Sequence, residues 1–172
     1  AYDIEFVALN NIKKDWLFDN NGQRLMNVNG STGGIASAAG VDSDIILGLT
    51  TEVNIGDNSK LLLLGDKTSP GELSITALND IDVKNNITLQ TGGWFGSGVA
   101  LDSQVTTLAP LASHINIGEG ALIDSIGDIN LLAMGGGTVD ASVNAETFGI
   151  ATVAVAVNTI DVDAKNTISV DE

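Results

Sequence analysis

Short apolar runs separated by turn-forming residues cover most of the chain after residue 30. Within the runs Val, Ile and Leu alternate with polar residues, and Gly, Asn and Asp follow them. Runs of this kind are typical of β-strands. The predicted strands are 51–56, 60–65, 72–78, 80–84, 86–91, 99–109, 113–118, 121–127 and 128–135. No segment after residue 30 keeps a 3.6-residue apolar period for three turns, so long helices are not expected.

Parts of the chain repeat one another. Asn54-Ile55-Gly56-Asp57 and Asn116-Ile117-Gly118-Glu119 stand at the same distance from Gly65-Asp66 and Gly127-Asp128. Two further matches join 31–44 with 90–103, and 79–89 with 158–170. A single unit of such a repeat cannot bury its apolar face alone, whereas stacked neighbours can.

The repeat favours a parallel β-helix, in which the chain winds into stacked coils. Three strands with their turns would take roughly 20–30 residues, which predicts the length of one coil. Alternate side chains would then point inward, and Gly and Asn suit the corners because they tolerate positive φ. An antiparallel β-sandwich also has many short strands. It does not explain the repeat, and Asn-Gly pairs that could form hairpin turns are nearly absent, Asn29-Gly30 being one of two in the chain.

The alternation also predicts a core of stacked aliphatic columns. We expect these side chains to point inward: Ile55, Leu62, Ile75, Ile81, Ile87, Ile117, Ile129, Leu131, Ile160 and Ile168.

Residues 1–30 differ from the remainder in composition. They hold four of the seven aromatic residues and three of the seven basic ones, Lys13, Lys14 and Arg24. We therefore divide the chain into an atypical segment, 1–30, and a repeat domain, 31–172. An open end of a stack invites another chain, so one hypothesis makes 1–30 a cap or an assembly element. Its basic residues would then pair head-to-tail with Asp161, Asp163 and Asp171 of a neighbour and build filaments. The alternative makes 1–30 an upstream coil with a degraded sequence.

The composition excludes several classes of function. Of 172 residues 22 are acidic and 7 basic, a net charge of -15, which repels nucleic acid and anionic lipid. The longest apolar stretch, 148–157, is about half of what a spanning helix needs, so no membrane insertion is expected. There is no cysteine, which excludes disulfides and thiolate metal sites. The chain starts at Ala1 without a signal peptide, so we expect a processed product or a piece of something longer.

Catalytic chemistry has little support in the sequence. His114 is the only histidine, and in the repeat it corresponds to Glu52, a surface position. Polysaccharide lyases share the β-helix and are the rival class, but they need clustered acidic ligands with a nearby base. Lys60, Lys67, Lys84 and Lys165 are widely spaced instead. We therefore expect no catalytic residue and no cofactor.

Paired carboxylates and one aromatic loop are the remaining candidate sites. Asp161 and Asp163, like Asp80 and Asp82, alternate on predicted strands, so each pair shares a face and can hold Ca²⁺. The pattern favours the plainer interpretation, an outward polar row. In residues 92–98, Trp94 and Phe95 stand between glycines without a following helix, which excludes a dinucleotide loop. The pair either forms a protruding tip for sugar or protein contact, or covers an apolar edge between coils.

The motif Val-Asn-Ile-Gly-Asp, followed by Gly-Asp and Leu-x-Ala, resembles large filamentous adhesins of bacteria, the filamentous-haemagglutinin and leukotoxin-like proteins. The matching segments are 53–77, 115–133 and 160–170. The resemblance implies a right-handed parallel β-helix at the cell surface, serving as an extracellular stalk or adhesive fibre. It implies a glycan or protein of a host or neighbouring cell as the partner. The chain lacks the family's secretion domain, which leaves room for a small β-solenoid subunit that polymerises.

Overall fold

The computed structural model describes residues 2–13 and 28–171, and every element in them is a β-strand. No helix in these residues has the length and apolar character needed to cross a bilayer. The strands are β1 (Ile4–Lys13), β2 (Val28–Leu47), β3 (Thr50–Ile55), β4 (Lys60–Leu62), β5 (Leu73–Thr107), β6 (Leu111–Ile117), β7 (Leu122–Asp124), β8 (Ile129–Phe148), β9 (Thr152–Asp161) and β10 (Ala164–Val170).

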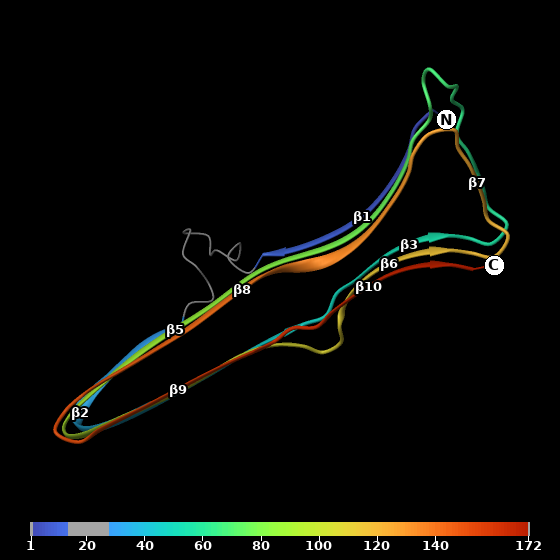
Figure 1. Ribbon diagram of the computed structural model, residues 1–172. Helices are drawn as coiled ribbons and strands as arrows, with labels where there is room; N and C mark the ends of the chain where they lie inside the picture. The colour runs from blue at the N-terminus through green and yellow to red at the C-terminus, as the bar shows by residue number, and fades with distance from the viewer. Residues whose placement is uncertain (1, 14–27, 172) are drawn as a thin grey trace, which may run out of the picture.

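The chain runs three times along the same flat, elongated path (Figure 1). The first pass is β1 to β4, the second β5 to β7 and the third β8 to β10. Every pairing between passes is parallel: β5 lies between β1 and β2 on one side and β8 and β9 on the other, and β6 lies between β3 and β10. β4 pairs with β7. The protein is therefore all-β with parallel strands, as the sequence predicts.

Two of the three sequence repeats lie directly beside one another in this arrangement. Asn54 pairs with Asn116 and Ile55 with Ile117, while Gly33 pairs with Gly92. The third match does not correspond to equivalent positions, because Ile81 pairs with Gly137 and Ile160 pairs with Val105. The predicted coil length was also wrong: Thr50 pairs with Ala112, so one pass takes 62 residues there.

The core consists of aliphatic clusters separated by polar layers. Along the first half of β5 every second side chain is buried, and the same alternation continues in β6. The buried clusters centre on Ile75 with Ile115, on Val83 with Val105, and on Leu89 with Val99. Because these partners come from opposite arms of the path, the interior is the space between two facing sheet layers.

Buried amide and hydroxyl groups occupy the positions between the clusters. Asn79, 1% exposed, accepts a hydrogen bond from Thr51 Oγ1 and donates one of 2.5 Å to the Ala112 carbonyl oxygen. Asn85 donates to Ser103 Oγ at 2.7 Å in the second such layer. The amides of these two layers are thus paired, as buried polar groups generally are.

The prediction of inward-pointing side chains is mostly correct in the second pass. In the other passes the exposure of such a side chain depends on whether a neighbouring strand covers it. Ile75, Ile81, Ile87, Ile55 and Ile117 are buried, and Leu131 packs against the first cluster. The inward prediction for Leu62 is wrong: its side chain is half exposed, while Leu61 and Leu63 pack inward.

Three other predicted core residues lie in inward columns of the third pass yet stay about half exposed. Ile129 pairs with the fully buried Leu73, Ile160 with Val105 and Ile168 with Ile115. No described strand covers their other side, so their exposure reflects the end of the stack and not a wrong orientation.

Asn and Gly occupy the equivalent tight turn of successive passes, as expected for corners. Asn58 has φ of 54° and is the only described non-glycine residue with positive φ; Gly120, with φ of 67°, lies over it. Asn58 N donates to the Glu119 carbonyl oxygen at 2.8 Å, which joins the two turns. A short polar side chain and a glycine are the residues that tolerate this conformation.

The described part of 1–30 joins the stack. Ile4–Lys13 forms β1 and pairs in register with Leu73–Asp82 of β5, as an edge strand. β1 therefore forms the start of the first pass. Lys14 and Arg24 lie outside the described residues.

Candidate functional site

The narrow end of the molecule is formed by three stacked turns. β2 and β5 each bend there at a Gly-Gly pair, with Gly33 opposite Gly92, and β8 gives way to β9 through Gly149. Gly149 has φ of 152°, and a Cβ there would lie 2.1 Å from the Gly93 carbonyl oxygen. A Cβ on Gly93 would lie 2.0 Å from the Gly96 carbonyl oxygen. The reversal therefore requires glycine at both positions, because a larger residue would collide with backbone.

Five large apolar side chains project from these turns, and we call this group the aromatic tip. Its members are Ile35, Trp94, Phe95, Phe148 and Ile150. Trp94 is 78% exposed and Phe95 66%, and their rings meet edge to face at 84° with centroids 6.3 Å apart. Most of both rings is therefore in contact with solvent at this turn.

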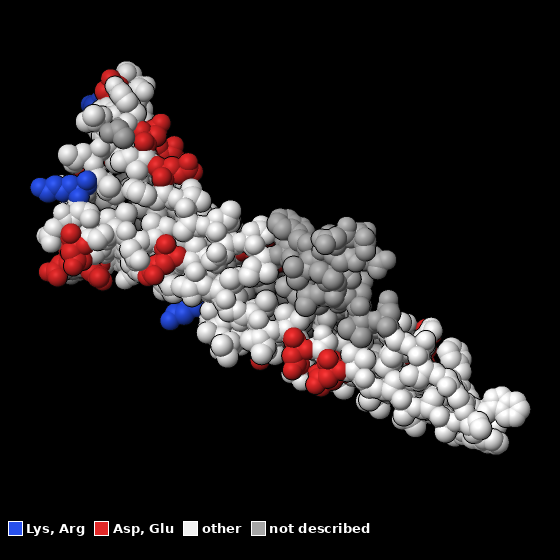
Figure 2. All heavy atoms as spheres, turned by 180° about the vertical axis from the view of Figure 1, so that it is seen from behind, with Lys and Arg blue, Asp and Glu red and all other residues white. Residues whose placement is uncertain are grey.

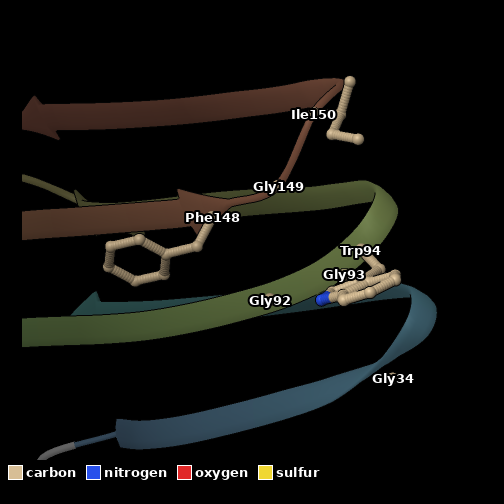
Figure 3. A pocket seen from close by; sticks show the side chains of 7 residues that line it. All are labelled: Gly34, Gly92, Gly93, Trp94, Phe148, Gly149 and Ile150. Atoms are coloured by element: carbon tan, nitrogen blue, oxygen red, sulfur yellow. The ribbon is translucent and has the colours of Figure 1, made fainter.

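Trp94, Phe148 and Ile150 surround an open hollow of about 550 Å³ (Figure 3). Its other lining residues are the glycines Gly34, Gly92, Gly93 and Gly149. Only backbone groups are therefore available for hydrogen bonds at its wall, beside the indole N–H of Trp94. Such a surface suits the apolar face of a sugar ring or an apolar protein side chain.

The sequence around the tip is free of charge in all three passes. Residues 31–41, 91–101 and 147–160 contain no Asp, Glu, Lys or Arg, although the chain carries -15 overall. The space-filling view shows the corresponding end of the molecule in white, with the acidic residues set back along the body (Figure 2). A partner at the tip is thus met by an uncharged surface.

Sequence reasoning identified Trp94 and Phe95 but missed the other three members of the tip. The signal was present in the match of 31–44 with 90–103, which sets Ile35 beside the aromatic pair. In the structure the register shifts between Gly34 and Ala36, opposite Gly93 and Gly96, and leaves Ile35 exposed.

His114 lies in an outward row between Glu52 and Thr167, one residue from each pass. Its pairing with Glu52 confirms the correspondence read from the repeat. His114 Nδ1 lies 2.5 Å from Thr167 Oγ1, while Glu52 accepts a hydrogen bond of 2.7 Å from Asn116. The order carboxylate, imidazole, hydroxyl resembles a catalytic triad. However, Glu52 is held by Asn116, and the row lies on the outer face of the sheet, where water has access.

The predicted carboxylate pairs lie on the outer surface. Asp80 and Asp82 point outward on β5, where Thr138 Oγ1 donates to Asp82 at 3.1 Å. Asp161 ends β9, whereas Asp163 lies in the link to β10. The prediction that the two carboxylates share one strand is therefore wrong. The described residues hold no group of three His, Asp or Glu side chains able to hold a metal ion. Two carboxylates alone are few ligands for Ca²⁺, which takes six to eight oxygens.

Comparison of the chain with family models, with curated proteins and with solved structures finds no match.

Proposed function

We propose that this chain is an extracellular structural and adhesive segment, built as a right-handed parallel β-helix. It would serve as a stalk portion or fibre-forming subunit of a bacterial surface adhesin. Three features support the proposal: the parallel register of successive passes, the in-register sequence repeats and the acidic outer surface. A stacked body of this kind projects a binding surface away from its point of attachment.

The observation that carries the adhesive role is the aromatic tip at the narrow end of the body. Large exposed apolar patches mark interaction sites on soluble proteins. The aromatic tip exposes five large apolar side chains together. The partner we propose is a glycan or a protein on a host or neighbouring cell. Trp94 and Phe95 would stack on its apolar face, and the bulk of the molecule's negative charge lies outside the contact.

The test is binding of the purified chain to glycan arrays and to intact epithelial and bacterial cells. We expect Trp94→Ala combined with Phe95→Ala to abolish retention without changing the melting temperature, because both rings are largely exposed. Leu108→Ala is the matched control, since Leu108 is 84% exposed and belongs to the link between β5 and β6. A double variant that binds like the parent would refute the role of the tip.

The rival function is a carbohydrate-active β-helix enzyme, for which the contact between His114 and Thr167 is the specific observation. It is tested by incubating the chain with acidic polysaccharides and Ca²⁺ and measuring released reducing or unsaturated ends. Reproducible turnover that disappears with a chelator or with His114→Ala would establish the enzyme and displace the adhesive proposal.

A further inference from the structure

Both ends of the stack present unpaired strand edges. Within the described ladders β1, β2 and β3 pair only with the second pass, and so do β8, β9 and β10. We call these the first edge and the last edge. The last edge exposes apolar side chains of inward columns: Ile129 at 45%, Ile160 at 49%, Ile168 at 46% and Val170 at 62%. Long open edges with apolar columns are the feature that pairs with another strand.

We propose that the last edge of one molecule pairs in parallel with the first edge of a second copy, in the register that already joins the passes. This proposal rests on the stacked architecture proposed above and names its partner. The register follows from the second pass: residues that pair with the same second-pass residue become neighbours. Ile129 and Ile4 both pair with Leu73, and Ile168 and Val53 both pair with Ile115.

The inward columns of the two edges match in character. Apolar residues meet apolar ones at Ile129 with Ile4, Leu131 with Phe6, Ile160 with Ile45, Ile168 with Val53 and Val170 with Ile55. The polar layers continue as well, since Asn158 meets Ser43 and Asn166 meets Thr51. A second copy therefore covers the exposed aliphatic side chains and gives the interior amides the partner types that they have between passes.

The outward columns bring no two carboxylates together along the described ladders. On the first edge Glu5, Asp42, Asp44 and Glu52 meet Asn130, Val157, Thr159 and Thr167. On the last edge Glu146 meets Ser31 and Asp161 meets Ile46. Between passes Asp42 already faces Asp102, and the contact between copies adds no further carboxylate pair within these ladders to a chain of net charge -15.

This register differs from the charge pairing considered for the sequence. Lys13 and Thr138 both pair with Asp82, so Lys13 would meet Thr138 and not Asp161. The contact is therefore governed by strand pairing and apolar columns, and the head-to-tail geometry continues without closing, as in a filament.

Introduced cysteines test the register, because the chain contains none of its own. Asn54 and Ser169 are exposed and both pair with Asn116. Within one molecule they are two strand spacings apart, about 9.6 Å, too far for a disulfide. In the proposed stack Ser169 lies one spacing, about 4.8 Å, from Asn54 of the next copy, which is within disulfide range.

We expect the chain carrying both Asn54→Cys and Ser169→Cys to form a ladder of dimers, trimers and higher oligomers on a non-reducing gel after mild oxidation. The controls are each single variant and the mismatched pair Asp44→Cys with Ser169→Cys, since Asp44 would face Thr159 instead. Circular dichroism of the reduced chains checks that each variant keeps its fold.

A double variant that stays monomeric, or that yields only the dimers formed by the single variants, would overturn the proposal. The same ladder from the mismatched pair would also overturn it, because contact would then be nonspecific. The readout needs no glycan or cell, so a failure of tip binding and a failure of stacking are told apart.

Discussion

At the scale of single residues, position within a column decides what a substitution costs. Ile117 is 6% exposed and pairs with Ile55 on one side and Val170 on the other. Leu122 is 49% exposed and pairs with Lys60. Both residues are apolar and strand-borne, so their different surroundings separate burial from residue type.

We predict that Ile117→Asp lowers the free energy of unfolding by about 3 kcal/mol or more, because it buries a charge without a partner. Leu122→Asp should change it by less than about 1 kcal/mol, since the new carboxylate is in water beside Lys60. Urea unfolding followed by circular dichroism measures both. Equal midpoints for the two variants would show that the inward assignment of Ile117 is wrong.

Glycine gives a second contrast at this scale, between two neighbours in β8. Gly137 has φ of 151°, and a Cβ there would lie 2.0 Å from the Ile81 carbonyl oxygen. A Cβ at Gly136 would have no atom of another part of the chain within 4 Å. We predict that Gly137→Ala destabilises the protein by about 1–3 kcal/mol through backbone strain and collision. Gly136→Ala should be neutral or stabilising by up to about 1 kcal/mol, because alanine restricts the unfolded chain. Thermal melts of the pair decide it.

At the scale of elements, the interior polar layers explain why the predicted strands are shorter than the observed ones. Asn79 and Asn85 separate the strands predicted at 72–78, 80–84 and 86–91, because Asn favours turns. All three runs lie within β5, where Asn79 and Asn85 point inward and bond to the opposite arm. Hydrogen bonding across the interior therefore outweighs local turn preference.

The predicted coil is too short for the same reason. The repeats themselves carried the correct spacing, since Asn54 and Asn116 are paired neighbours, but counting strands between turn residues divided one pass into several. Strand type and inward parity could be predicted because they depend on alternation, and the parallel character could be predicted because it follows from the repeat. Leu62 could not be assigned, since four consecutive leucines, 61–64, show no alternation.

We predict that Asn79→Ala lowers the free energy of unfolding by about 2–3 kcal/mol, because the Thr51 hydroxyl loses its acceptor and the Ala112 carbonyl loses the amide donor inside the molecule. Thr51 Oγ1 keeps only the bond that it accepts from Asn10. Asn86→Ala is the control: Asn86 lies on the outward face of the same strand and accepts a bond from Ser142. In a double-mutant cycle with Thr51→Val, the double variant should cost less than the sum of the single ones. Additive costs would show that the two side chains do not act as one layer.

At the scale of the whole molecule, net charge and strand edges act in opposite directions on self-association. A charge of -15 repels copies from one another, while the apolar columns of the last edge favour their contact. Screening shortens the range of the repulsion to about 10 Å at 0.1 M salt and about 3 Å at 1 M, and it leaves apolar contact intact.

We therefore predict that the mean mass from light scattering rises when salt increases from about 20 mM to about 500 mM, as the repulsion is screened. Pairing between basic residues of 1–30 and Asp161 or Asp163 predicts the reverse, since salt weakens exposed ion pairs. Ile168→Lys sharpens the test, because it sets a charge in the half-exposed column that would meet Val53 of the next copy. That variant should stay monomeric at every salt concentration, whereas Lys165→Gln, which changes the charge by one unit in the same strand without blocking a column, should still associate. A mass that falls with salt in the parent chain would reject stacking by apolar columns and favour the ion pairs.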